Sequence, residues 1–131
     1  MAEMTPQRPL RVYLIEDSPD VRDLFLVFFH VPGEVEIVGH SDTENESVAA
    51  ILASPVDAVI VDLNLREGNG MAVIEKIRKA NLMPRPSIIV FTNQPFPEIR
   101  RRAMLLEADY FFDKSVDHEG VRATLRKLRP Q

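Results

Sequence analysis

Polar side chains capable of chemistry stand directly after short apolar runs of this sequence. Glu16 and Asp17 follow one run, and Asp62 ends another. Thr92 and Lys114 follow two later runs. Apolar runs of this length, rich in β-branched residues, are typical of strands that are buried on both faces of a sheet. Because the carboxyl ends of parallel strands meet at one edge of a sheet, we expect these five side chains to lie together.

Carboxylates gathered at one edge would repel each other, which suggests a bound cation. Two unit charges about 4 Å apart interact by roughly 4 kcal/mol at an effective dielectric constant of about 20. Oxygen ligands in an open site, without His or Cys, suit Mg²⁺ better than zinc. With Lys114 and Thr92, such a cation could bind the oxygens of a transferring phosphoryl group. One carboxylate could then become an aspartyl phosphate.

Each of these residues also has an ordinary structural interpretation. Asp62 could simply begin a turn, as Asp often does. Lys114 could be a solvated surface lysine, and Thr92 a hydroxyl at the end of a strand. Their joint placement at four separate strand ends favours the chemical interpretation.

Five apolar runs alternate with five segments of helical periodicity, joined by short links. We expect strands over residues 10–15, 35–39, 57–62, 87–91 and 109–113, and helices over 20–31, 45–53, 71–81, 97–107 and 118–129. This alternation predicts an α/β fold with a doubly wound, five-stranded parallel sheet. Right-handed crossovers favour the strand order 2-1-3-4-5, whose switch point lies between the first and third strands.

The first helix carries more apolar residues than one core-facing stripe requires. Helical spacing predicts that Val21, Leu24, Phe25 and Phe28 face the core. Leu26, Val27 and Phe29 widen the apolar arc, and Leu26 should lie near the polar side. Two interpretations remain open: a heavily buried helix, or a helix that presents a docking face to a partner. In the other helices we expect the inward residues to be Val48, Ile51 and Leu52; Val73, Ile74 and Ile77; and Val121, Leu125 and Leu128.

Composition sets limits on the function. The 131 residues suit one domain, and the net charge of −4 gives no broad basic field for direct nucleic-acid binding. There is no cysteine, and no apolar stretch approaches the roughly 20 residues of a membrane span. Residues 1–9 form a polar lead-in that we expect to be mobile, without the apolar core of a signal peptide. A cytoplasmic protein is the simplest expectation.

From residue 10 to 129 the chain resembles the receiver domain of two-component response regulators. The resemblance rests on Glu16-Asp17, on Asp62-Leu63-Asn64-Leu65 with Gly70 eight residues after Asp62, on Phe91-Thr92, and on the stretch from Ala108 to Lys114. It implies the flavodoxin-like (βα)5 fold with the strand order given above. We expect the receiver domain to span residues 10–131 with no output domain.

By this resemblance, Asp62 looks like the phosphoacceptor, and Lys114 and Thr92 match the residues that contact the phosphoryl group. Glu16 and Asp17 match the acidic pair that holds Mg²⁺, together with Asp62 and the backbone carbonyl of Asn64. Thr92 and Phe111 match the switch pair, and Tyr110 is the easy wrong choice for the aromatic member. Asn64, Asn93 and Gln94 match positions that tune phosphorylation and dephosphorylation rates.

Three residues depart from the family pattern. Arg66 replaces the proline usual four residues after the acceptor, so we expect a looser loop there. Ser115 replaces the proline usual after the lysine, which leaves open whether the Lys114–Ser115 peptide is cis. Asn93 replaces a small residue and could narrow access to Asp62.

The resemblance implies a signalling switch that catalyses its own phosphorylation and dephosphorylation rather than a conventional turnover enzyme. Its expected partners are a sensor histidine kinase or a histidine phosphotransfer protein, and a downstream protein of unknown identity. Phosphorylation would change the face formed by the last two helices and the last strand, where homodimerisation is possible. We expect no direct nucleic-acid or membrane contact.

Two other interpretations remain open. The first is a pseudo-receiver, a constitutive protein-interaction module that is not phosphorylated. This interpretation is disfavoured by the intact site residues, which are the acidic pair, Asp62, Thr92 and Lys114. It is favoured by the departures at Asn93, Arg66 and Ser115. The second is a haloacid-dehalogenase-like phosphatase. Such enzymes carry a second Asp two residues after the nucleophile, where this chain has Asn64.

Overall fold

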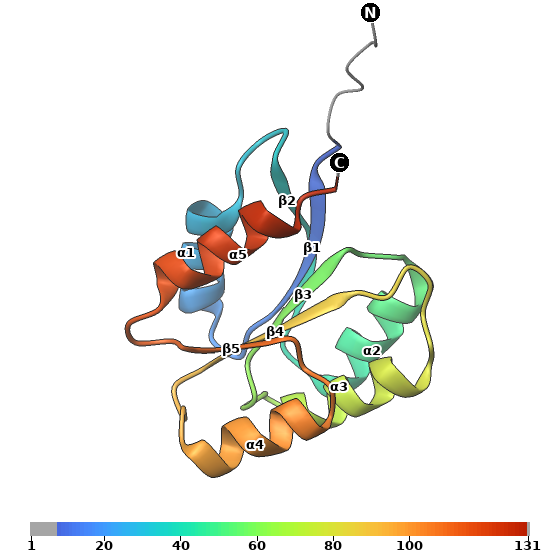
Figure 1. Ribbon diagram of the computed structural model, residues 1–131, viewed down its shortest axis with the longest axis vertical. Coiled ribbons are helices and arrows are strands. Elements are labelled where there is room, and N and C mark those ends of the chain that lie inside the picture. The colour runs from blue at the N-terminus through green and yellow to red at the C-terminus, as the bar shows by residue number, and fades with distance from the viewer. Residues whose placement is uncertain (1–7, 131) are drawn as a thin grey trace, which may run out of the picture.

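The computed structural model describes residues 8–130, which form a three-layer α/β unit (Figure 1). The chain alternates as β1 (Leu10–Ile15), α1 (Pro19–Phe29), β2 (Val35–Ser41), α2 (Glu44–Ala53), β3 (Ala58–Val61), α3 (Gly70–Lys79), β4 (Ser87–Thr92), α4 (Pro97–Leu105), β5 (Tyr110–Asp113) and α5 (His118–Leu128). All paired strands are parallel, in the order β2-β1-β3-β4-β5. The predicted fold class and strand order are therefore confirmed.

The helices cover both faces of the sheet, as Figure 1 shows. On one face α1 and α5 pack over a core that includes Phe25, Phe29 and Phe91. On the other face α2, α3 and α4 pack over a second core that includes Ile74 and Phe111. Because side chains alternate along a strand, β1, β3, β4 and β5 contribute to both cores, whereas the edge strand β2 contributes only to the core under α1 and α5. The central strand β3 is buried throughout, as its run of apolar residues predicts.

The buried face of helix α1 differs from the predicted one. Leu24 was expected in the core but is 60% exposed, whereas Phe29 is only 1% exposed. Val27 is 80% exposed, so this helix is not buried on all sides. Phe25 and Phe29 are one turn apart and pack together, with ring centroids 5.2 Å apart. The inward stripe is therefore rotated away from Leu24.

In the other helices most of the predicted inward residues are buried, but Val48 and Leu128 are half-buried and Leu52 is exposed. Leu52 on α2 is 48% exposed, and the buried side of this helix is formed by Ser47 and Ile51. Ser47 satisfies its hydroxyl by donating to the backbone carbonyl of Thr43. The buried side of α2 thus includes a small polar residue and excludes Leu52, and Ser47 can be buried because its hydroxyl has a local hydrogen-bond partner.

The lead-in predicted over residues 1–9 falls largely outside the described residues. Within it, Arg8 is held by Asp57, whose carboxylate lies 2.9 and 3.0 Å from the guanidinium nitrogens. Asp57 also accepts from the backbone N–H of Arg11 at 2.8 Å. This pair ties the start of β1 to the turn before β3. Among residues 8–130, none of the helices has the length and apolar character needed to cross a bilayer.

Candidate functional site

The predicted site residues lie at the carboxyl edge of the sheet because the strands are in register. Ile15 pairs with Val61, and Val61 pairs with Val90. The chain therefore delivers Glu16, Asp62 and Thr92 to the same edge. Lys114 joins them because its backbone N–H donates to the carbonyl of Thr92 at 2.8 Å. The backbone N–H of Asp62 likewise donates to the carbonyl of Ile15 at 3.0 Å.

Lys114 stands between two buried carboxylates. Its Nζ lies 2.7 Å from Glu16 Oε1 and 3.0 Å from Asp62 Oδ2. Glu16, Asp62 and Lys114 are only 3%, 5% and 9% exposed. One ammonium group thus offsets the repulsion between Glu16 and Asp62 that the sequence alone suggests. We call these three residues the Lys114 cluster.

Burial and pairing act in opposite directions on the pKa values in this cluster. Desolvation raises the pKa of Glu16, although hydrogen bonds from Lys114 and from the Ser18 backbone favour its charged form. Burial by itself would lower the pKa of Lys114. The hydrogen bonds and negative charges of Glu16 and Asp62 outweigh burial and raise that pKa. Lys114 is therefore a permanent cation at neutral pH.

Asp17 differs from Glu16 because its side chain is exposed. Its carboxylate makes no hydrogen bond or ion pair within residues 8–130. Glu16 and Asp17 open onto a hollow of about 180 Å³ whose wall also includes Ser41, Asp42 and Glu46. No group of three or more His, Cys, Asp or Glu side chains in the described part of the chain is already gathered as a metal site.

The donor atoms at this edge nevertheless suit a hard cation. Asp62 Oδ1 accepts only the Asn64 backbone N–H, at 3.2 Å, and Asp17 has both oxygens free within residues 8–130. Oxygen donors beside an open acidic hollow are the ligands that Mg²⁺ prefers. The residues present therefore fit the predicted cation by their chemistry.

Thr92 and Phe111 share one face of the sheet. Thr92 is fully buried, and its Oγ1 accepts the backbone N–H of Gln94 at 3.0 Å. Phe111 lies in the core beneath α4, with the guanidinium of Arg100 5.8 Å from its ring centre. Tyr110 points to the opposite face and stacks on Phe112. The predicted choice of Phe111 over Tyr110 therefore agrees with the strand alternation, and its role in switching stays a prediction.

The loop after Asp62 depends on a glycine. The backbone N–H of Gly70 donates to the carbonyl of Leu63 at 2.9 Å. A Cβ at this position would collide with the carbonyl oxygen of Asp62 and would lie 2.8 Å from the Cα of Leu63. Asn64 lies in this loop, and Asn93 and Gln94 follow β4; all three are exposed.

Arg66 ties the same loop to the connection between β2 and α2. Its guanidinium donates to both carboxylate oxygens of Asp42, at 3.0 and 3.2 Å, and its backbone N–H donates to the carbonyl of Asp42 at 3.0 Å. The pKa of Asp42 is lowered by these hydrogen bonds. Glu44 also accepts from the Asn69 backbone N–H and from Lys76. The expectation of a looser loop is not what the structure shows, because Arg66 brings its own partner.

Asp42 and Glu44 are the site-supporting residues that sequence reasoning missed. Arg66 and Asp42 are 24 positions apart, and no periodic pattern connects them. The signal in the sequence was Arg66 at a position where proline is usual, because an arginine there indicates an acidic partner. The sequence does not show which Asp or Glu is that partner.

The turn after Lys114 is also closed by side chains. Asp113 Oδ1 accepts from the backbone N–H and the hydroxyl of Ser115, at 2.9 and 2.7 Å. Within residues 8–130 the one cis peptide bond joins Met83 and Pro84, so the Lys114–Ser115 peptide is trans.

Comparison with known proteins supports the resemblance seen in the sequence. The family model of the response regulator receiver domain matches residues 12–126. The chain is 27% identical over 122 residues to the sensory transduction protein LytT of Bacillus cereus, a match that covers 93% of this chain and 48% of LytT. It is 24% identical over 124 residues to the nitrate/nitrite response regulator protein NarL of Escherichia coli, covering 95% of this chain and 56% of NarL. The chain thus spans about half the length of these relatives.

Solved structures share the fold. The signal receiver domain of the putative response regulator NarL from Mycobacterium tuberculosis has a TM-score of 0.83 at 20% identity, covering 92% of this chain and 95% of that one. The chemotaxis protein CheY4 of Vibrio cholerae has a TM-score of 0.79 at 18% identity, covering 92% and 98%. The strand order and the edge cluster agree with the family match over residues 12–126. This chain therefore belongs to the family of response regulator receiver domains.

Proposed function

We propose that this receiver domain is a phosphorylation-activated switch in which Asp62 accepts the phosphoryl group. The observation that carries the proposal is the Lys114 cluster. It holds a nucleophilic carboxylate and a permanent cation 3.0 Å apart at the switch point of the sheet. A phosphohistidine of a sensor kinase or a phosphotransfer protein would be the donor.

The transfer step uses Asp62 Oδ1, the carboxylate oxygen that is not paired with Lys114. As this oxygen forms its bond to phosphorus, the bond between phosphorus and the histidine nitrogen breaks, and its electron pair leaves with the imidazole. The phosphoryl group brings negative charge next to Lys114, whose ammonium can follow one of the new oxygens. The Thr92 hydroxyl, which accepts the Gln94 N–H in this state, can turn its proton toward another oxygen.

Asp17, Asp62 and the backbone carbonyl of Asn64 would hold Mg²⁺, with Glu16 acting through water. The bound cation would supply positive charge to the phosphoryl oxygens. The chain's own contribution is placement: Glu16 accepts from Lys114 at 2.7 Å and from the Ser18 N–H at 3.0 Å, which orients the lysine toward Asp62. Glu16 is thus a positioning residue for Lys114.

Phosphorylation would then bias the surface around Phe111. This ring is buried beneath α4, and Thr92 precedes the loop that leads into α4. A movement of Thr92 toward the phosphoryl group would alter the packing of that helix and the partners it prefers. The downstream partner and a homodimer of the phosphorylated form stay predictions.

An NMR titration with Mg²⁺ and beryllofluoride, a mimic of the phosphoryl group, tests this proposal. We expect the amide resonances of Asn64, Thr92 and Lys114 to shift with both reagents present, and the shifts to vanish in Asp62→Ala. Asp57→Ala, which removes a carboxylate at the other end of β3, is the matched control and should respond like the native chain. Shifts that survive Asp62→Ala would contradict the assignment of Asp62.

The pseudo-receiver is the alternative function. It is favoured by the departures from the family pattern at Asn93, Arg66 and Ser115, of which Asn93 is an exposed residue directly after Thr92. A native chain that shows no shift with Mg²⁺ and beryllofluoride would support it.

A further inference from the structure

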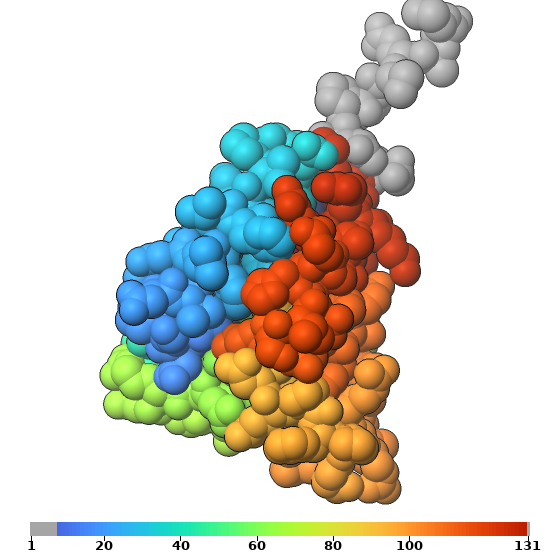
Figure 2. Space-filling model, turned by 90° about the vertical axis from the view of Figure 1, so that its left-hand side faces the viewer, coloured from blue at the N-terminus to red at the C-terminus, as the bar shows by residue number. Residues whose placement is uncertain are grey.

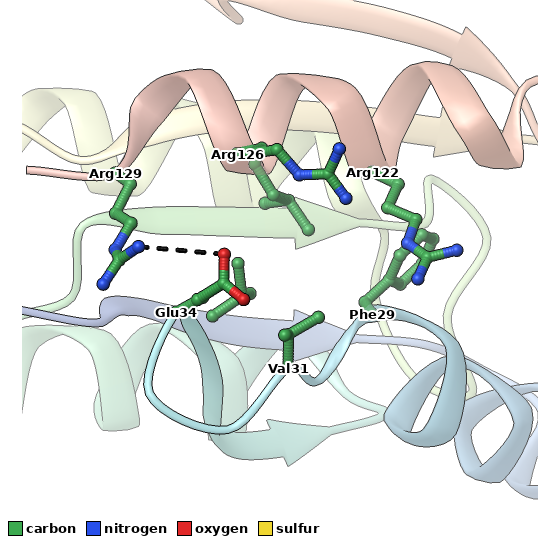
Figure 3. Close-up of a pocket in the computed structure, with 8 residues that line it drawn as sticks. Phe29, Val31, Glu34, Arg122, Arg126 and Arg129 are labelled. Carbon is green, nitrogen blue, oxygen red and sulfur yellow. Dashed lines mark ion pairs between the residues drawn. The ribbon is translucent and has the colours of Figure 1, made fainter.

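Two of the hollows in the surface are lined by charged residues and differ in the room that they offer. The first lies between α5 and the connection from α1 to β2, and Figure 3 shows Arg129 facing Glu34 across it. This hollow is only about 20 Å³, and Phe29 in its wall is buried. The second, of about 180 Å³, adjoins the acidic pair Glu16 and Asp17. The charged groups around the second hollow therefore bear on the phosphoacceptor site.

The connection from β2 to α2 forms part of the wall of the second hollow and is bonded to the loop after Asp62. The backbone N–H of Arg66 donates to the carbonyl of Asp42 at 3.0 Å. The backbone N–H of Glu44 donates to the carbonyl of Glu67 at 2.9 Å. These bonds join the two segments as in a short parallel bridge. Figure 2 shows the loop part of the chain, in light green, below the start of α1. We call Asp42, Glu44, Arg66 and Glu67 the loop clamp.

Side chains reinforce the loop clamp. The Arg66 guanidinium donates to both carboxylate oxygens of Asp42, at 3.0 and 3.2 Å. Glu44 accepts from the backbone N–H of Asn69 at 3.2 Å and from Lys76 at 2.7 Å. A bidentate pair of this kind fixes the direction of the contact as well as its length. The loop is therefore held both at its middle and at its end.

The clamped loop carries Asn64, whose backbone carbonyl is one of the ligands that the proposed function gives to Mg²⁺. Asn64 lies two residues before Arg66 and pairs with Asn69 in an isolated antiparallel bridge. The sheet does not extend to Asn64, because β3 ends at Val61. The loop clamp therefore gives this part of the chain a support that the sheet does not provide.

The same connection also contacts the acidic pair on the other side of the hollow. The backbone N–H of Glu16 donates to the carbonyl of Ser41, one residue before Asp42, at 3.1 Å. The connection from β2 to α2 thus contacts both segments that carry the expected ligands, the acidic pair after β1 and Asn64 after β3. Because groups that hold the ligands in place strengthen metal binding, the loop clamp should affect the affinity for Mg²⁺.

We propose that Arg66 and Asp42 are positioning residues for Mg²⁺ binding, because their pairing holds the Asn64 carbonyl in place relative to Asp17 and Asp62. This inference rests on the proposed function, which takes Mg²⁺ as the occupant of the site. Arg66 is itself a cation near an acidic hollow, so its charge alone would weaken Mg²⁺ binding. By holding the loop it strengthens that binding. The two effects have opposite signs, and Arg66→Ala separates them.

An NMR titration with Mg²⁺ alone measures the dissociation constant from the amide shifts of residues 16–17 and 62–64. We expect Arg66→Ala to raise this constant about fivefold, the scale of one exposed ion pair. Arg66→Lys keeps the charge but loses the bidentate geometry, so it should raise the constant by a smaller factor. The matched control is Arg22→Ala. Arg22 also lines the hollow, but it pairs with Asp23 on α1, so its removal should leave the constant unchanged or lower it.

The double variant tests whether the two residues act as a pair. In the Asp42→Ala background, Arg66→Ala should no longer raise the dissociation constant. Three results would overturn the inference and leave the assignment of Asp62 intact: an unchanged or lower constant in Arg66→Ala, the same rise in Arg66→Ala and Arg22→Ala, or a full further rise in the double variant. A native chain without any Mg²⁺-dependent shift would instead overturn the Mg²⁺ site of the proposed function, and this inference with it.

Discussion

Lys114 and Arg126 carry the same charge in opposite surroundings. Lys114 is buried between two carboxylates at 2.7 and 3.0 Å, so its charge is fully compensated within the fold. Arg126 is exposed, and its side chain has no partner within residues 8–130. Removing the first should damage the folded state, whereas removing the second should leave it intact. The comparison teaches that a buried ion cluster is coupled to stability, whereas an unpaired surface charge contributes little to it.

The largest effect is expected for Lys114→Met. This substitution leaves Glu16 and Asp62 buried and unpaired, which should lower the free energy of unfolding by about 3–5 kcal/mol. Urea denaturation followed by circular dichroism measures the change. Lys127→Met, an exposed lysine on α5, is the control and should change the midpoint little. Equal midpoints for the two variants would show that Lys114 does not compensate the carboxylates.

Gly70→Ala should have the next largest effect. The new Cβ would collide with the Asp62 carbonyl oxygen, and overpacking of this kind costs about 1–3 kcal/mol. Thermal unfolding in a calorimeter gives the loss. Gly33→Ala tests the explanation, because Gly33 has a φ of +81° but no atom lies within 4 Å of the place that an added Cβ would take. That variant should lose only the strain of the left-handed conformation, about 1 kcal/mol. A larger loss at Gly33 than at Gly70 would contradict the steric account.

Arg66→Ala should change how the stability of the loop after Asp62 depends on pH, without changing the fold. Arg66 lowers the pKa of Asp42, so the Asp42 carboxylate contributes stability above its unfolded pKa of about 3.9. This contribution is lost as the pH falls through the lower folded pKa. An NMR titration should find that Arg66→Ala raises the pKa of Asp42, and amide exchange at residues 63–69 should become faster. An unchanged Asp42 pKa would mean that the pair does not hold in solution.

The smallest effect on stability is expected for Arg126→Ala. A surface substitution without a partner usually changes the free energy of unfolding by less than about 0.5 kcal/mol. The same urea experiment checks this value. A substantial loss of stability would show that Arg126 is engaged within the fold.

Much of the fold could be predicted because its signals are local. Strands buried on both faces give unbroken apolar runs, and their alternation with helices leaves few topologies. The same alternation gathered Glu16, Asp62, Thr92 and Lys114 at one edge. Helix α1 shows the limit of this kind of prediction. Apolar residues cover most of its surface, so periodicity alone does not decide whether Leu24 or Phe29 is buried; packing against the sheet and α5 decides it.

The charge arrangement of the site was harder to predict. Three carboxylates suggested a cation among them, but the sequence could not show that Lys114 itself lies between Glu16 and Asp62. It also could not show that Arg66 and Asp42 pair, since their contact depends on how two loops meet at the edge of the sheet. The partner of a long side chain depends on which groups lie within its reach in the folded structure, and spacing along the chain does not determine this.

Intact mass spectrometry tests the central claim most directly. The native chain and Asp62→Asn are each incubated with acetyl phosphate in the presence and absence of Mg²⁺. The proposal predicts that the native chain gains one phosphoryl group only with Mg²⁺ and that Asp62→Asn gains none. A gain by Asp62→Asn, or no gain by the native chain, would contradict the assignment of Asp62 as the phosphoacceptor.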